Sequence, residues 1–95
     1  MVEKKADGNL AVSGRIDTSN AAEFEEQLLA TCTPGEKVFI DAQDLKYISS
    51  AGLRVLLSAH KKMDAKGGKM KLININEMVR EVLEVTGFMS VLTVE

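Results

Sequence analysis

Residues 41–57 decide the fold of this 95-residue chain, and they read DAQDLKYISSAGLRVLL. The stretch follows the apolar run Val38-Phe39-Ile40, which favours a buried strand, and it ends in apolar residues at helical spacing. It therefore predicts a strand, a loop and a helix in succession. Ser49 and Ser50 fall where the loop becomes the helix. A serine there can cap the helix, and the positive end of the helix dipole also favours a phosphoryl group on Ser50.

The composition is typical of an ordinary globular domain, and we expect one domain over residues 1–95. The 12 basic and 14 acidic residues are spread along the chain, so no basic field favours nucleic acid or anionic lipid. No apolar run approaches the roughly 20 residues of a membrane-spanning helix, which predicts no membrane insertion. The charged amino-terminal segment and the single Cys32 favour a cytoplasmic location.

The residues before the central stretch predict two strands and a helix. Asp7-Gly8-Asn9 is typical of a hairpin turn that follows a short edge strand. Apolar residues at alternate positions predict one strand over residues 10–16. Asn20, with Glu23 three positions later, resembles a capping box and predicts a helix start, while Thr33-Pro34-Gly35 predicts the end of that helix.

The residues after the central strand alternate between helix and strand patterns. We expect a helix over residues 51–66, a half-buried strand over 69–74, a helix from the N-cap Asn76 to Gly87, and a last short strand over 91–94. Strands separated by helices imply parallel neighbours joined by crossovers. The sequence therefore predicts an α/β fold, with a small mixed β-sheet and helices in the order β-β-α-β-α-β-α-β.

An enzymatic interpretation finds little support in the residues. Ser50 would need a general base, but the sole histidine, His60, lies ten residues further on, about 15 Å along the predicted helix and on its apolar face. No Gly-x-Ser-x-Gly nucleophile motif surrounds Ser50. The spacing of Asp17, Asp41 and Asp44 does not match a metal-binding loop. We predict no catalytic residue, no metal site and no cofactor.

Residues 47–57, YISSAGLRVLL, resemble the signature of STAS domains, and of the stand-alone bacterial anti-sigma factor antagonists in particular. The flanking motifs Gly14-Arg15-Ile16-Asp17 and Thr86-Gly87-Phe88 resemble two further motifs of that family in the same order. In the family, the serine two residues before the glycine is phosphorylated by the partner anti-sigma factor. The resemblance thus implies Ser50 as the phosphorylation site. Ser49 departs from the pattern, since many members have Asp there, which implies a missing contact or a different partner.

The resemblance also implies a partner-binding loop around Ser50. Acidic positions surround the phosphorylation site in the family, and Arg54 follows Ser50 at a helical spacing that would let its guanidinium meet a phosphate. Of these two interpretations of Arg54, we favour an ordinary solvated arginine. The residues that we expect at this loop are Ser49, Ala51, Gly52, Arg54, Asp17 and Asp41.

The resemblance implies that the protein is an anti-sigma factor antagonist and that it is not itself an enzyme. Its dephosphorylated form would bind an anti-sigma factor and free a sigma factor, and phosphorylation of Ser50 would switch it off. The partner would be a histidine-kinase-like serine kinase that uses ATP and Mg²⁺, with a separate serine phosphatase to restore Ser50. An accessory subunit of a membrane transport complex is the main alternative, and a small hydrolase is the third.

Overall fold

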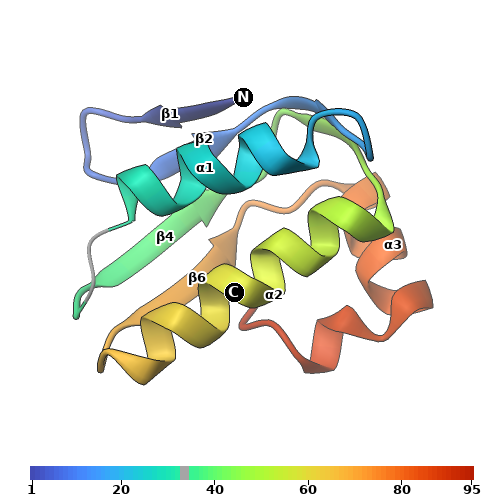
Figure 1. The fold of residues 1–95 in the computed structure, drawn as a ribbon. Helices are drawn as coiled ribbons and strands as arrows, with labels where there is room; N and C mark the ends of the chain where they lie inside the picture. Colours follow the sequence, from blue (N-terminus) through green and yellow to red (C-terminus); the bar gives the residue numbers. More distant parts are fainter. Residues whose placement is uncertain (33–34) are drawn as a thin grey trace.

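The computed structural model describes residues 1–32 and 35–95, and within these ranges it has six strands and three α-helices (Figure 1). The strands are β1 (Val2–Lys4), β2 (Leu10–Val12), β3 (Gly14–Ile16), β4 (Lys37–Asp41), β5 (Leu45–Ile48) and β6 (Lys69–Ile73). The helices are α1 (Ala21–Thr31), α2 (Ser50–Ala65), α3 (Glu77–Thr86) and the short 3-10 helix η1 (Phe88–Ser90).

The main sheet has four strands in the order β1-β2-β4-β6, and α1 and α2 cover the same face of it (Figure 1). β1 is antiparallel to β2, whereas β4 is parallel to both β2 and β6. The predicted α/β fold with a mixed sheet is confirmed. Alternate strand residues are buried, as expected for a sheet with one face packed against helices: Leu10, Val12, Val38, Ile40, Met70 and Leu72.

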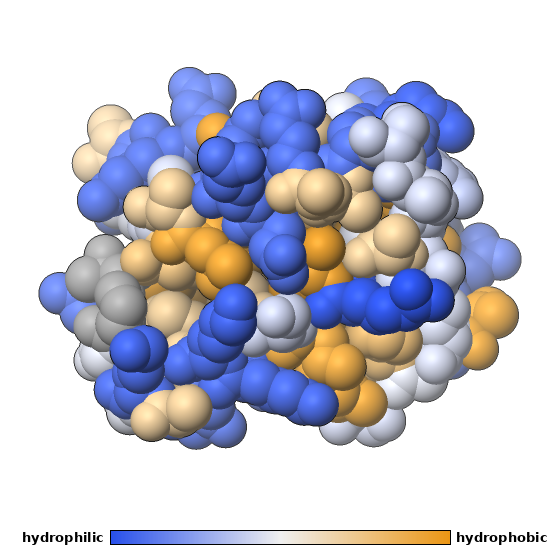
Figure 2. All heavy atoms as spheres, viewed as in Figure 1, coloured by the Kyte–Doolittle hydropathy of each residue, from blue (hydrophilic) through white to orange (hydrophobic). Residues whose placement is uncertain are grey.

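The outer surfaces of α1 and α2 are mostly hydrophilic, with some apolar atoms visible between the two helices (Figure 2). None of the described helices has both the length and the apolar content needed to cross a membrane.

The single strand predicted over residues 10–16 is divided into two strands in the structure. β2 stays in the main sheet, while β3 leaves it and pairs with β5 in a separate two-stranded parallel sheet. The division falls at Ser13 and Gly14, and Gly14 has a φ of +81°, a left-handed conformation that glycine adopts without steric cost. The apolar residues Leu10, Val12 and Ile16 keep the same parity on both sides of this break, so their pattern does not indicate that the strand is divided.

The prediction also missed β5, and a bulge explains why. The register shifts so that Gly14 pairs with Leu45 but Arg15 pairs with Tyr47, which leaves Lys46 as an extra residue. Lys46 and Tyr47 are therefore both exposed between the buried Leu45 and Ile48. This spacing of three does not show the two-residue period of a regular strand.

The last predicted strand is much shorter than expected. Residues 91–94 follow η1 and form only one parallel bridge, between Val94 and Leu72. The Leu72 N–H donates to the Thr93 carbonyl at 2.9 Å, and the Glu95 N–H donates to the Leu72 carbonyl at 2.9 Å. Two bonds to one residue are enough to hold the carboxyl-terminal end against the β6 edge without a regular strand.

The ends of α1 differ in part from the prediction. The helix starts after Asn20, as predicted, but the Asn20 side chain does not cap it, so the predicted capping box is wrong. Its amide instead bridges two residues before the helix, as described below. The helix ends at Thr31. Of the predicted stop, Thr33-Pro34 lie outside the described residues, and Gly35 has a φ of +86°.

The first turn of α2 packs very closely on the small β3–β5 sheet, and Gly52 makes this approach possible. A Cβ atom on Gly52 would lie 2.7 Å from Cγ2 of Ile16 and 2.7 Å from Cγ1 of Ile48. Both isoleucines are buried, at 0% and 3% exposure, so they have little room to move. The glycine therefore sets the distance between the helix start and the sheet beneath it.

We expect Gly52→Ala to lower the free energy of unfolding by about 1–3 kcal/mol, because the methyl group overpacks a tight contact. Helix propensity alone predicts the opposite sign, since alanine is favoured over glycine by about 1 kcal/mol within a helix. Urea denaturation measures the change, with Ser58→Ala on the same helix as a control for propensity. A Gly52→Ala variant as stable as the wild type would contradict the close packing.

Candidate functional site

The two serines at the start of α2 have different roles. Ser49 is the N-cap, and its hydroxyl accepts a hydrogen bond from the Gly52 N–H at 3.3 Å. Its own N–H donates to the Ile16 carbonyl at 2.8 Å, which joins the loop to the end of β3. Ser50 is the first residue of the helix and is exposed. Capping therefore belongs to Ser49, and Ser50 is presented to solvent.

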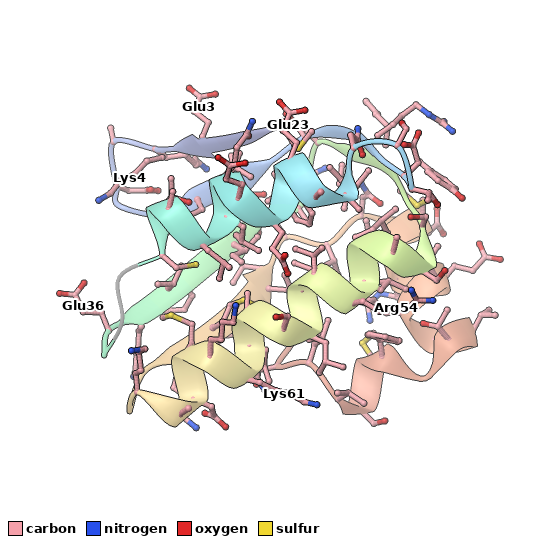
Figure 3. The ribbon with its side chains drawn as sticks, viewed as in Figure 1. Glu3, Lys4, Glu23, Glu36, Arg54 and Lys61 are labelled. Carbon is pink, nitrogen blue, oxygen red and sulfur yellow. The ribbon has the colours of Figure 1, made fainter. Side chains whose placement is uncertain are left out.

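The first turn of α2 favours negative charge at Ser50. Its N–H and that of Ala51 belong to the first turn of α2, at the positive end of the helix dipole. The first turn of α2 contains no acidic residue, whereas α1 has Glu23 and α3 has Glu77 in that place. Arg54 is exposed one turn further along and projects on the side of α2 nearer to α3 (Figure 3). A phosphoryl group on Ser50 would thus meet no acidic neighbour within its own helical turn.

Asp17 directly follows Ile16, whose carbonyl accepts from the Ser49 N–H, and a direct part for Asp17 in the loop around Ser50 stays a prediction. Hydrogen bonds from the hydroxyl and the N–H of Ser19 hold the pKa of the Asp17 carboxyl below its usual range. The Asn20 side chain closes the same turn: its oxygen accepts from the Asp17 N–H and its amide donates to the Arg15 carbonyl, both at 2.8 Å. Residues 17–20 therefore form a second loop tied down next to the serines.

Asp41 is placed differently from Asp17. It is the last residue of β4 and is buried, at 8% exposure. Its carboxylate accepts from Lys5 Nζ at 3.0 Å, from Asn74 Nδ2 at 3.2 Å and from the Gln43 N–H at 2.9 Å. None of these three partners belongs to the serine loop. Asp41 joins the turn after β1 to the end of β6, and a direct part in the loop around Ser50 stays a prediction.

The Asp41 contacts also set its ionisation. Burial alone would raise the pKa of the Asp41 carboxyl, but the bonds from Gln43, Lys5 and Asn74 outweigh burial and lower it. The same hydrogen bond from the ammonium to Asp41, reinforced by their charge attraction, raises the pKa of Lys5. The pair therefore remains ionised over the neutral pH range.

Asn76 is the residue at this site that sequence reasoning identified only in part. It is the N-cap of α3, as predicted, and its oxygen accepts from the Val79 N–H at 2.9 Å. In addition, its amide contacts two carbonyls of the β4–β5 turn, Ala42 at 3.4 Å and Gln43 at 3.0 Å, and the carbonyl of Leu45 at the start of β5 at 2.8 Å. One side chain thus attaches α3 to the turn that leads into β5 and the serines. The N-cap signal finds the residue, but these contacts, 31 to 34 residues back along the chain, have no local signature.

Comparison with known proteins assigns the family. The model of the STAS domain matches residues 1–95, the whole of the sequence. The chain belongs to the STAS domain family. Among its relatives, this STAS domain is 40% identical over 93 residues to BtrV of Bordetella bronchiseptica, a protein named as a candidate anti-sigma factor antagonist. That alignment covers 95% of this chain and 80% of BtrV.

Solved structures show the same fold. The STAS domain superimposes on an anti-sigma factor antagonist from Mycobacterium paratuberculosis with a TM-score of 0.78 at 23% identity, covering 99% of this chain and 81% of that one. It superimposes on the anti-sigma factor antagonist SpoIIAA in its unphosphorylated form with a TM-score of 0.73 at 15% identity, covering 100% of this chain and 86% of that one. The helix and sheet arrangement around Ser50 is therefore that of a STAS fold.

We expect Asn76→Asp to lower the free energy of unfolding by about 1–3 kcal/mol, because it leaves carbonyls, two of them in partly buried hydrogen bonds, without their donor while keeping the cap acceptor for Val79. Amides of β5 should also exchange faster with solvent. Denaturation and hydrogen exchange measure the two effects. Asn9→Asp makes the same chemical change outside this network and is the control. Equal stability of the Asn76 and Asn9 variants would show that the amide contacts contribute little.

Asp41 gives the stability of the protein a defined pH dependence. Because folding lowers its pKa, Asp41 stabilises the protein above its usual pKa of about 4, and this stabilisation is lost as the pH falls through the lowered value. We expect Asp41→Asn to be less stable by about 1–3 kcal/mol at pH 7, and the difference from the wild type to shrink as the pH falls below about 4 and the Asp41 carboxyl becomes protonated. Denaturation over this pH range measures it, with the exposed Asp44→Asn as control. A pH-independent difference would contradict the assignment.

Proposed function

We propose that this protein is an anti-sigma factor antagonist, controlled by phosphorylation of Ser50. The observation that carries the proposal is the exposure of Ser50 at the first position of α2, within the segment that matches the STAS signature. The 40% identity to BtrV supports the same class of function. In the proposed cycle, the dephosphorylated form binds an anti-sigma factor through the serine loop and the exposed flank of α2, and a sigma factor is released.

Electrostatics at the interface explain how phosphorylation would end this binding. A phosphoryl group adds about −1.5 to −2 charges at pH 7, which about doubles the net charge of a chain at −2. Within an interface it brings bulk, a desolvation cost and repulsion from acidic groups. A loss of only about 2.7 kcal/mol in binding free energy lowers the affinity a hundredfold. The start of α2 favours the negative charge, so the domain need not refold.

The chain would be the substrate of the kinase and not a catalyst. The Ser50 hydroxyl would attack the γ-phosphorus of ATP held with Mg²⁺ by the anti-sigma factor, a histidine-kinase-like serine kinase, and ADP would leave. The general base would come from the kinase, since His60 lies more than two helical turns beyond Ser50. Among the described residues, no group of His, Cys, Asp and Glu is arranged to hold a metal ion. A separate phosphatase would hydrolyse the phosphoserine, and we place this cycle in the cytoplasm, where sigma factors act.

Phosphorylation by purified kinases tests the proposal. Each histidine-kinase-like serine kinase of the source organism is incubated with the protein, ATP and Mg²⁺, and the product is read by mass spectrometry. We expect one kinase to phosphorylate Ser50, Ser50→Ala to react at least a hundredfold more slowly, and Ser49→Ala to react within a few fold of the wild type. The phosphorylated protein should bind that kinase at least a hundredfold more weakly.

The Ser49→Ala control needs one precaution, because loss of the cap costs about 1 kcal/mol of stability. The assay is therefore run well below the melting temperature of each variant. Phosphorylation of Ser50→Ala to the same extent as the wild type would refute the site. Failure of every kinase to bind or phosphorylate the wild type would refute the function.

A further inference from the structure

An arginine and a tyrosine are stacked on the outer face of the small β3–β5 sheet. The Arg15 guanidinium lies over the Tyr47 ring, 4.6 Å from its centroid, and the two residues are cross-strand partners. Tyr47 is 38% exposed, so part of its ring faces solvent. Arg15 is exposed as well, so the stacked pair is a cation–π contact at the protein surface.

The bulge in β5 produces this exposure. A regular strand would turn one of two successive residues inward, but the extra residue in β5 lets Lys46 and Tyr47 both face outward. The buried Leu45 and Ile48 hold the strand on either side of the bulge. Two basic residues, Arg15 and Lys46, therefore accompany one exposed aromatic ring.

The pair borders the proposed phosphorylation site. Tyr47 is two residues before Ser49, and the residue after Arg15 accepts the hydrogen bond from the Ser49 N–H at 2.8 Å. Beneath them, Ile16 and Ile48 pack against the Gly52 position of α2. Any protein that covers the Ser50 loop from the side of this small sheet would also contact Arg15 and Tyr47.

The stacked arrangement leaves the guanidinium able to bind another group. Stacking uses the flat face of the guanidinium, while its N–H donors lie along the edge. In the described part of the chain, the Arg15 side chain forms neither a hydrogen bond nor an ion pair. The nearby Asp17 carboxylate is already bonded to Ser19. Since the ring holds Arg15 in place, less conformational entropy is lost when a partner binds it.

We propose that Arg15 and Tyr47 form a docking pair that binds carboxylate side chains of the anti-sigma factor next to its kinase site. The proposal rests on the proposed function and adds the chemistry that the partner must present. Arginine binds carboxylates through two parallel hydrogen bonds, and tyrosine and arginine are enriched among the residues that dominate interface energies. A phosphoryl group on Ser50 would bring negative charge to the same place and repel those carboxylates.

Binding to the kinase that phosphorylates Ser50 tests the docking pair. Affinities are measured by calorimetry for the wild type, Arg15→Ala, Arg15→Glu, Tyr47→Ala and Tyr47→Phe. The control for Arg15→Glu is Lys4→Glu, which makes the same reversal of charge on an exposed side chain of β1. Figure 3 shows Lys4 and Arg54 on opposite sides of the molecule. Thermal melting of each variant establishes that it is folded at the temperature of the assay.

We expect Arg15→Ala and Tyr47→Ala to weaken binding at least tenfold, and Arg15→Glu to weaken it further. Tyr47→Phe, which keeps the ring, and Lys4→Glu should stay within about threefold of the wild type. Raising the salt concentration should weaken the wild type more than Arg15→Ala. Unchanged affinities of the Ala variants, with Ser50 still phosphorylated, would overturn the docking pair alone. Tighter binding by Arg15→Glu than by Arg15→Ala would show that the partner surface is basic and would overturn it as well.

Discussion

The close approach of α2 to the small β3–β5 sheet is the constraint on which the rest of the site depends. It exists because Gly52 has no side chain, so that the helix backbone can lie directly on Ile16 and Ile48. This contact fixes the distance between the start of α2 and the β3–β5 sheet. The cap at Ser49 and the exposure of Ser50 both follow from that position. Ser50 is thus presented to solvent on a closely packed support.

Three short loops lie around this support, and hydrogen bonds from polar side chains fasten each of them. Asn20 closes the turn after β3, Asn76 binds carbonyls of the turn before β5, and Ser49 caps α2. Each of these side chains satisfies backbone groups that would otherwise lie unpaired near the surface. Hydrogen bonds of this kind, from a side chain to nearby backbone groups, give a surface loop a fixed shape.

Local sequence patterns were sufficient to predict the fold class and to place Ser50 at the start of a helix. The apolar periodicity of α2, the N-cap at Asn76 and the stop at Gly87 all depend on residues within one or two turns of each other. The same patterns failed where a strand was irregular. Alternation ran through the break at Gly14, and the bulge at Lys46 concealed β5.

The sequence by itself determined the α/β class, the three helices and the resemblance that points to Ser50, because these depend on periodicity and on short motifs. Only the tertiary structure decided which serine caps the helix, that Asp41 bonds to Lys5, and that Arg15 stacks on Tyr47. The last two join positions more than 30 residues apart, and the cap depends on how closely α2 approaches the small sheet. Such contacts are set by which strands pair and in which register, and no local pattern along the chain encodes them.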